Sequence, residues 1–248
     1  MITNELIKES QRYLMNTYAR QPLVLVKGRG TRVFDSDGKE YIDFVSGVAV
    51  DNLGHCNQRV VVALQKQAQR LLHVSNHFHI ETQIALAREL VKHSFAHKVF
   101  FCNSGTEAVE AAIKLARRYS REVLKMDRFE IITMRGSFHG RTYGAVSATA
   151  QEKFHQGFEP VLPGFRYIPF DDLQAAEAAV NDRTCAILVE PIQGEGGVNV
   201  PAKGYLAGLR ALCDRHKLLL IFDEVQTGVG LTGSMWCWPG PRTGSPGR

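Results

Sequence analysis

From residue 98 onward, short apolar segments alternate with longer amphipathic segments, and this alternation constrains the fold more than any other feature. Each apolar segment has the length of a buried strand, and each amphipathic segment repeats its apolar residues at helical spacing. Such an alternation indicates an α/β fold, in which helices cover both faces of a mostly parallel sheet. The expected strands cover 99–102, 131–134, 166–168, 186–189 and 218–222, and the expected helices cover 106–118, 172–180 and 203–216.

The first part of the chain has a different pattern, with short strand candidates at 23–26, 32–34 and 41–45. Asp37 and Gly38 join the last two, and an Asp-Gly pair there is a strong signal for a β-hairpin. The stretch 35–43 has a faint likeness to a calcium-binding loop, but it lacks the acidic fifth residue and the closing glutamate. We therefore predict a hairpin, followed by helices near 60–72 and 84–91.

Composition and charge argue against several classes of function. The longest apolar run, at 218–222, is much too short to cross a bilayer, and the first ten residues have no apolar signal core. The formal net charge of +5 comes from scattered Lys and Arg residues, which indicates a solvated surface and no nucleic-acid site. The five cysteines form no CxxC pair, so we expect no metal site and no redox dithiol. The expected setting is the reducing cytoplasm.

Ligands of such sheets bind beyond the carboxyl ends of the strands, so the segments there are the candidates for chemistry. The first is 103–108, with the sequence NSGTEA. Gly105 lets the backbone approach a ligand closely, and the start of the next helix offers N–H groups that suit a phosphate. The alternative is an ordinary helix N-cap formed by Ser104 or Thr106, with Glu107 favourable in the first turn.

The second segment is 136–142, with the sequence GSFHGRT. Phe138 can form a flat wall for a heteroaromatic ring, and Arg141 can bind a carboxylate through two parallel hydrogen bonds. A Gly-rich surface turn with a solvated arginine is the alternative.

The third segment is 190–197, with the sequence EPIQGEGG. It closes a buried strand with two carboxylates, Glu190 and Glu195. Either glutamate could be an acid–base group or pair with Arg141, and both could also simply face water.

The fourth segment begins at Asp223, directly after the apolar run 218–222. An acid there is costly to bury unless it has a cationic or hydrogen-bonding partner. A protonated pyridine nitrogen would be such a partner, because the aspartate would keep the ring cationic and able to accept electrons. A magnesium ligand of a phosphate-transfer enzyme is the competing interpretation, but the sequence has no Gly-Lys-Ser/Thr loop to go with it.

Taken together, NSGTEA, SFHGRT, EPIQGEGG and DEVQTGVG, with YIDFVSGVAVDNLGHC before them, resemble the class III aminotransferases. The resemblance covers about residues 10–235 and is strongest to the branch that uses N-acetylornithine. It implies the aspartate aminotransferase-like fold (fold type I) and the cofactor pyridoxal 5′-phosphate. It also implies a homodimer that transfers an amino group from N-acetylornithine to 2-oxoglutarate, giving glutamate, in arginine biosynthesis. Ornithine, succinylornithine, 4-aminobutyrate and lysine are alternative donors within the family.

The resemblance implies individual contacts to the cofactor. Gly105 and Thr106 would bind its phosphate. Phe138 and Val225 would pack on opposite faces of the pyridine ring, and Asp223 would pair with the ring nitrogen.

Three further roles are implied by the same resemblance. Gln226 would reach the ring hydroxyl, and Arg141 would bind the substrate carboxylate. Glu195 would be the gating acid that lets one site accept both the donor and 2-oxoglutarate.

The family's Schiff-base lysine lies roughly thirty residues beyond the ring-pairing aspartate. Counted from Asp223, that position falls past Arg248, and neither Lys203 nor Lys217 matches it. We therefore expect a truncated chain that lacks the catalytic lysine and is inactive on its own, and we consider a frameshift or early stop as its origin. A non-catalytic cofactor-binding or dimerisation fragment is the alternative. In such a chain, the strand at 99–102 would lack a neighbour on one side.

By the same resemblance, the chain would have three parts. Residues 1–46 would be the N-terminal segment of the small domain, and residues 47–235 would be an incomplete large domain that binds the cofactor. Residues 236–248 are rich in Pro and Gly, do not resemble the family, and are expected to be disordered.

Overall fold

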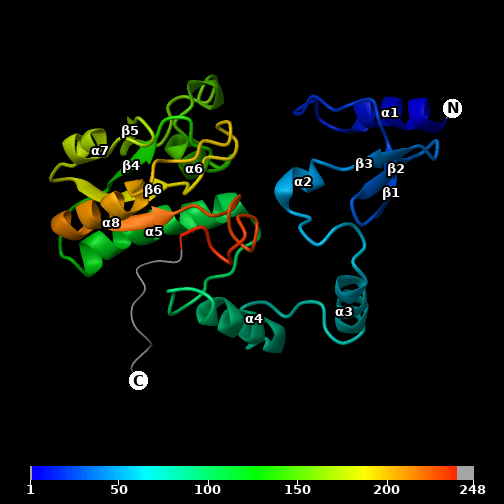
Figure 1. The fold of residues 1–248 in the computed structure, drawn as a ribbon, viewed down its shortest axis with the longest axis horizontal. Coiled ribbons are helices and arrows are strands. Elements are labelled where there is room, and N and C mark those ends of the chain that lie inside the picture. The colour runs from blue at the N-terminus through cyan, green and yellow to red at the C-terminus, as the bar shows by residue number, and fades with distance from the viewer. Residues whose placement is uncertain (1, 239–248) are drawn as a thin grey trace. The chain divides into compact units, whose positions relative to one another are not determined.

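The computed structural model describes residues 2–238, whose contacts form two compact units that divide between Glu81 and Thr82 (Figure 1). We call residues up to 81 unit 1 and those from 82 onward unit 2. The domain boundaries expected at 46 and 235 concern a different division and stay predictions. Within the described part of the chain, no helix has the length and apolar content needed to span a membrane.

Unit 1 contains a three-stranded antiparallel sheet in the order β1-β2-β3. The strands are β1 (Leu25–Arg29), β2 (Arg32–Asp35) and β3 (Glu40–Ile42). The helices are α1 (Ile2–Tyr13), α2 (Ser46–Ala49) and α3 (Gln58–Ala68). Helix α1 was not expected from the sequence. Strand β1 begins two residues later than expected, and a β-bulge lies between Leu25 and Lys27.

The predicted hairpin between β2 and β3 is confirmed, and a side chain holds it. One oxygen of Asp35 (Oδ1) accepts hydrogen bonds from the backbone N–H groups of Asp37 and Lys39, and the other accepts one from the Tyr41 hydroxyl at 2.7 Å. The third strand stops at Ile42, short of the expected residue 45. Its end coincides with a local turn, in which the Asp43 carboxylate accepts from the N–H groups of residues 45 and 46.

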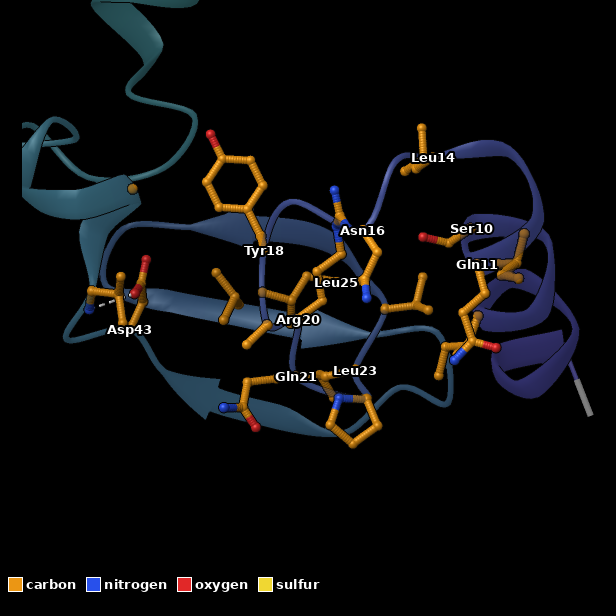
Figure 2. A pocket seen from close by; sticks show the side chains of 18 of the residues that line it. Ser10, Gln11, Leu14, Asn16, Tyr18, Arg20, Gln21, Leu23, Leu25 and Asp43 are labelled. Carbon is orange, nitrogen blue, oxygen red and sulfur yellow. Dashed lines mark hydrogen bonds between the residues drawn. The ribbon is translucent and has the colours of Figure 1, made fainter. Parts of the chain in front are cut away.

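A cavity of about 1150 Å³ lies within unit 1, between α1, the following loop and the sheet (Figure 2). Its lining is mostly apolar and includes Leu6, Ile7, Leu14, Leu23, Leu25 and Val33. None of the eight site residues expected from the sequence lines it.

Unit 2 contains a four-stranded sheet in the order β5-β4-β6-β7, and every neighbouring pair is parallel. The strands are β4 (Glu130–Met134), β5 (Phe165–Ile168), β6 (Thr184–Val189) and β7 (Leu219–Phe222). The helices are α4 (Glu81–Lys92), whose first residue belongs to unit 1, α5 (Gly105–Glu122), α6 (Tyr143–Ala148), α7 (Leu173–Ala179) and α8 (Tyr205–His216), and η1 (Glu152–Phe154) is a 3₁₀ turn. The predicted α/β fold with a parallel sheet is therefore confirmed.

The central strands β4 and β6 divide the hydrophobic core into two halves. On one face, Ile132 and Ile187 pack with buried residues of α7 and α8, such as Leu209. On the other face, Ile131 and Leu188 pack with buried residues of α5 and α6. Full burial of one such side chain contributes about 1.5–3 kcal/mol, so the two halves together fix the sheet and its covering helices.

One expected strand, at 99–102, is wrong. The segment is irregular and pairs with no strand in the described residues, and Phe100 is 72% exposed. An extended segment gains ladder hydrogen bonds only beside a partner, and the sheet ends at β5 and β7. The apolar composition of segment 99–102 predicted a strand, but it does not specify a neighbouring strand for the segment to pair with.

The last described residues lie in the segment that was expected to be disordered. The N–H groups of Cys237 and Trp238 donate to the Glu224 carboxylate at 2.6 and 3.1 Å, and the Trp238 ring packs on Phe222. Residues 239–248 lie outside the described residues.

Candidate functional site

The three loops that follow β4, β6 and β7 lie at one edge of the unit 2 sheet. These strands are parallel neighbours, so their carboxyl ends meet there. The loops are 135–142, 190–199 and 223–230, and the start of α5 joins them. Seven of the eight expected site residues have contacts within this group of loops, and the eighth, Glu195, lies on the same loop as Glu190.

A buried pair, His139 and Asp223, connects the first loop to the third. Its Nδ1–Oδ2 distance is 2.8 Å, and the two side chains are 0% and 5% exposed. The other Asp223 oxygen accepts from the N–H of Val225 at 3.1 Å. The burial of an acid at the end of β7 is therefore matched by partners on both oxygens, as burial of a carboxylate requires.

His139 is itself fixed by the protein around it. Its backbone N–H donates to the Thr149 hydroxyl at 2.8 Å. Its second ring nitrogen, Nε2, is buried and has no hydrogen-bond partner among the described residues. The histidine is therefore fixed through Nδ1 and its backbone, and its Nε2 is an unpartnered buried atom.

Glu190 connects the first loop to the second. Its two oxygens accept from the backbone N–H groups of Phe138 at 2.8 Å and Gly194 at 3.1 Å. Burial raises the pKa of this carboxyl above its ordinary value, and these two hydrogen bonds act in the opposite direction. Glu190 thus holds the backbone of the site, and among the described residues it forms no ion pair with Arg141.

Buried Gln193 locks the same two loops together. Its amide nitrogen donates to the Arg135 carbonyl at 2.9 Å, and its amide oxygen accepts from Asn199. A Cβ added to Gly196 would lie 2.3 Å from the Gly136 carbonyl oxygen, so the close approach of the loops requires glycine there.

Helix α5 begins beside the third loop. The Ser104 hydroxyl accepts from the N–H of Glu107 at 3.3 Å, so the predicted N-cap is confirmed for this residue. The Glu107 carboxylate in turn accepts from Asn103, and these bonds hold its pKa below the ordinary range. In the part of the chain that the structure describes, the N–H groups of Gly105 and Thr106 have no partner. They remain free donors at the positive end of an 18-residue helix.

Close packing joins the remaining ring and phosphate candidates. A Cβ added to Gly105 would lie 2.9 Å from a methyl group of Val225, so these residues are in direct contact. A Cβ on Gly194 would lie 3.3 Å from the Gln226 side chain. The loops after β6 and β7 and the start of α5 therefore pack directly against one another.

Arg141 lies against an aromatic pair. Its guanidinium carbon is 5.6 Å from the centre of the Phe138 ring and 4.6 Å from that of Phe154, and the two rings meet edge to face. Arg141 and Glu195 are both exposed, and neither has an ion-pair partner among the described side chains. The cation is therefore held at the surface of the site by ring contacts.

Sequence reasoning missed three contributors to this site. His139 is the partner that Asp223 needs, Thr142 connects the first loop to α5, and Phe154 supports Arg141. A signal for His139 was available, because it follows Phe138 directly in a loop whose strand ends at the same sheet edge as β7.

The arrangement has complementary chemical parts. It offers a buried carboxylate, two free helical N–H groups, an aromatic face and an exposed guanidinium. Such a set suits a flat heterocycle that has a protonatable nitrogen and a phosphate, together with a small carboxylate. Within the described residues, no cluster of His, Cys, Asp and Glu suits a metal ion.

Comparisons with known proteins show the family of the chain. The family model described as aminotransferase class-III matches residues 13–240. The acetylornithine aminotransferase of Caldanaerobacter subterraneus is 52% identical over 231 residues, which are 93% of this chain and 59% of that protein. The one from Methanocaldococcus jannaschii is 49% identical, over 92% of this chain and 57% of that protein. The chain thus spans somewhat more than half the length of these relatives.

Solved structures show the same likeness. The ornithine aminotransferase of Toxoplasma gondii superposes with a TM-score of 0.91 at 38% identity, over 95% of this chain and 56% of that one. Its description reports pyridoxal phosphate at the active site of that protein. The N-acetylornithine aminotransferase of Stenotrophomonas maltophilia superposes with a TM-score of 0.75 at 42% identity, over 93% of this chain and 56% of that one.

Proposed function

Because the chain belongs to the class III aminotransferases, whose cofactor is pyridoxal 5′-phosphate, we propose that the loops of unit 2 bind this cofactor for amino-group transfer. The proposed donor is N-acetylornithine and the proposed acceptor is 2-oxoglutarate, which becomes glutamate. The names of relatives at about half identity support this choice. The fold is that of the fold type I enzymes.

The buried Asp223 carboxylate carries the proposal. It lies at the end of β7 on a side chain that is 5% exposed, with His139 on one oxygen and the Val225 N–H on the other. An anion held there would keep a pyridine nitrogen protonated. When bound, the cofactor supplies a cationic ring that withdraws electrons from the substrate carbon. Phe138 and Val225 would lie on the two faces of the ring, and Gln226 would reach the ring hydroxyl.

The start of α5 is the proposed phosphate site. The free N–H groups of Gly105 and Thr106 point out of the first turn of a long helix, where the backbone dipole favours an anion. The Ser104 cap already satisfies Glu107, so the phosphate would complete the donors of that turn.

Two residues would contact the substrates. Arg141 presents a guanidinium from its aromatic support and would bind a substrate carboxylate. Glu195 lies on the exposed part of the 190–199 loop and would neutralise Arg141 when the bound substrate has no carboxylate to offer it. The expected homodimer and the cytoplasmic setting stay predictions.

A different amino donor is the second candidate function. One relative that is 49% identical has the name succinylornithine transaminase/acetylornithine aminotransferase, and the Toxoplasma structure is an ornithine aminotransferase. The fold and the ring contacts are common to these choices, so the donor has to be decided by experiment.

Titration of the purified chain with pyridoxal 5′-phosphate, followed by absorbance and equilibrium dialysis, tests the proposal. We expect saturable binding of one cofactor per chain, and a cooperatively melting protein that binds none would contradict it. Borohydride treatment and peptide mapping would then report whether any lysine becomes attached to the cofactor. Absorbance changes of the bound cofactor on addition of N-acetylornithine, succinylornithine or ornithine, which require binding and not turnover, would identify the donor that the site accepts.

A further inference from the structure

The carboxylate of Glu110, one turn after Thr106 on α5, connects that helix to the start of α6. Its Oε1 accepts from the Thr142 hydroxyl at 2.5 Å, from the Gly144 N–H at 2.8 Å and from the Ala145 N–H at 3.1 Å. A Cβ added to Gly144 would lie 2.4 Å from the other carboxylate oxygen, so the contact requires glycine at that position. Three hydrogen bonds to one charged oxygen make this a strong connection.

The number of available protons determines which hydroxyl is the donor between Thr142 and Thr106. The Thr142 and Thr106 hydroxyls are 2.8 Å apart, and the Thr142 N–H also donates to the Thr106 hydroxyl oxygen at 3.2 Å. An ionised carboxylate only accepts, so the single hydroxyl proton of Thr142 goes to Glu110. Thr106 must therefore be the donor in the pair of hydroxyls, and its only side-chain proton is already committed.

Close packing fixes the same junction from the other side. A Cβ added to Gly140 would lie 2.4 Å from the Thr106 hydroxyl oxygen, and the φ of Gly140 is +122°. The first turn of α5 and the 140–142 loop thus touch without spare space, and Glu110 is the charged group that holds them in this register.

We propose that Glu110 is a positioning residue for the phosphate turn, acting through Thr142 and Thr106. The inference rests on the proposed function and deepens it. The relay holds the side chain of Thr106 away from the ligand, so that a phosphate meets the backbone N–H groups of Gly105 and Thr106. Glu110 has no contact with the ligand itself, and its contribution is the position of these two donors.

Affinity measurements with pyridoxal 5′-phosphate and with pyridoxal, which lacks the phosphate, test the proposal. For Glu110→Ala, we expect roughly a tenfold loss of affinity for the phosphorylated compound and less than about a twofold change for pyridoxal. Glu110→Gln keeps a carbonyl oxygen at the Oε1 position and should recover most of the loss. Glu122→Ala, at the far end of α5, is the matched control and should change neither affinity.

Several outcomes would overturn the inference. Equal losses for both compounds in Glu110→Ala would mean a general effect on the fold, and no loss for either would mean no positioning role. If Glu110→Ala does not fold, Thr142→Val interrupts the same relay and should give the phosphate-specific loss, with recovery in Thr142→Ser. A wild-type chain that binds neither compound would instead contradict the proposed function.

Discussion

His139 and Asp223 lie 84 residues apart in the chain, yet Nδ1 of the histidine and Oδ2 of the aspartate meet at 2.8 Å in a buried contact. The contact joins the loop after β4 to the loop after β7, although β6 lies between the two strands. It therefore holds these two loops of the site together, and it gives the buried carboxylate the partner that its position demands.

Replacement of His139 by Phe should destabilise unit 2 by about 1–3 kcal/mol, because a buried carboxylate loses its hydrogen-bond partner. Urea unfolding at neutral pH would measure the change. A double-mutant cycle with Asp223→Asn should return a coupling energy of about 0.5–3 kcal/mol. Additive effects of the two substitutions would contradict the contact.

Gly140→Ala should weaken both stability and cofactor binding. The added methyl group would lie 2.4 Å from the Thr106 hydroxyl, and the φ of +122° is unfavourable for any residue with a Cβ. Gly157→Ala is the control, since its φ is +84° but no atom lies within 4 Å of the new Cβ. We expect the control to show only a modest loss of stability and full binding. Equal binding defects in the two variants would show that backbone strain, not the contact with Thr106, is responsible.

Glu190 should make the stability of unit 2 depend on pH. Burial raises its folded pKa above the ordinary value of 4.5, so the native state keeps a proton that the unfolded chain releases. The native state is therefore penalised as pH rises through and above 4.5, and a neutral side chain escapes this penalty. The difference in stability between Glu190→Gln and wild type should therefore shift in favour of the variant as the pH is raised from about 4 to about 7. Urea unfolding midpoints of the two proteins at each pH would measure this difference. If the stability difference between the variant and wild type does not change with pH, Glu190 is not a buried group that titrates in this range.

Asp35, in the hairpin of unit 1, has a lowered pKa, so its effect on stability has the opposite dependence on pH to that of Glu190. The Tyr41 hydroxyl is the largest cause of the lowered pKa of Asp35. The stability that this contact contributes is present above the ordinary value of 3.8 and is lost as pH falls through the lowered value. Tyr41→Phe should move the pKa of Asp35 up toward 3.8 in an NMR titration. Lys39→Ala, which removes a weaker contribution, should move it less.

Much of unit 2 could be predicted because its strands are short, mostly apolar and separated by helices, most of them amphipathic. Strand β6 and helix α5 lie within a few residues of their expected positions. Helix α6 was missed, since its small buried residues give no amphipathic pattern. The segment 99–102 has the composition of a strand, but composition does not specify a neighbour.

The loops that form the candidate site could be predicted from the sequence, but the contacts between these loops could not. Each polar loop after a strand could be recognised from its own sequence, including Asp223 and Arg141. The partner of Asp223 could not, because the His139 contact depends on the strand order β4-β6-β7. That order is a property of the packed sheet, whereas the alternation of strands and helices gives only their sequence along the chain.

Binding of pyridoxal 5′-phosphate by wild type and by Asp223→Asn tests the central claim most directly. Asp171→Asn, in the loop after β5 at the same sheet edge, serves as the control. If Asp223 holds the protonated ring nitrogen, loss of its charge should weaken binding by roughly 10- to 100-fold, as expected for a charged hydrogen bond, while the control binds as wild type does. Unchanged affinity in a folded Asp223→Asn protein would contradict the assignment of this carboxylate and of the site built around it.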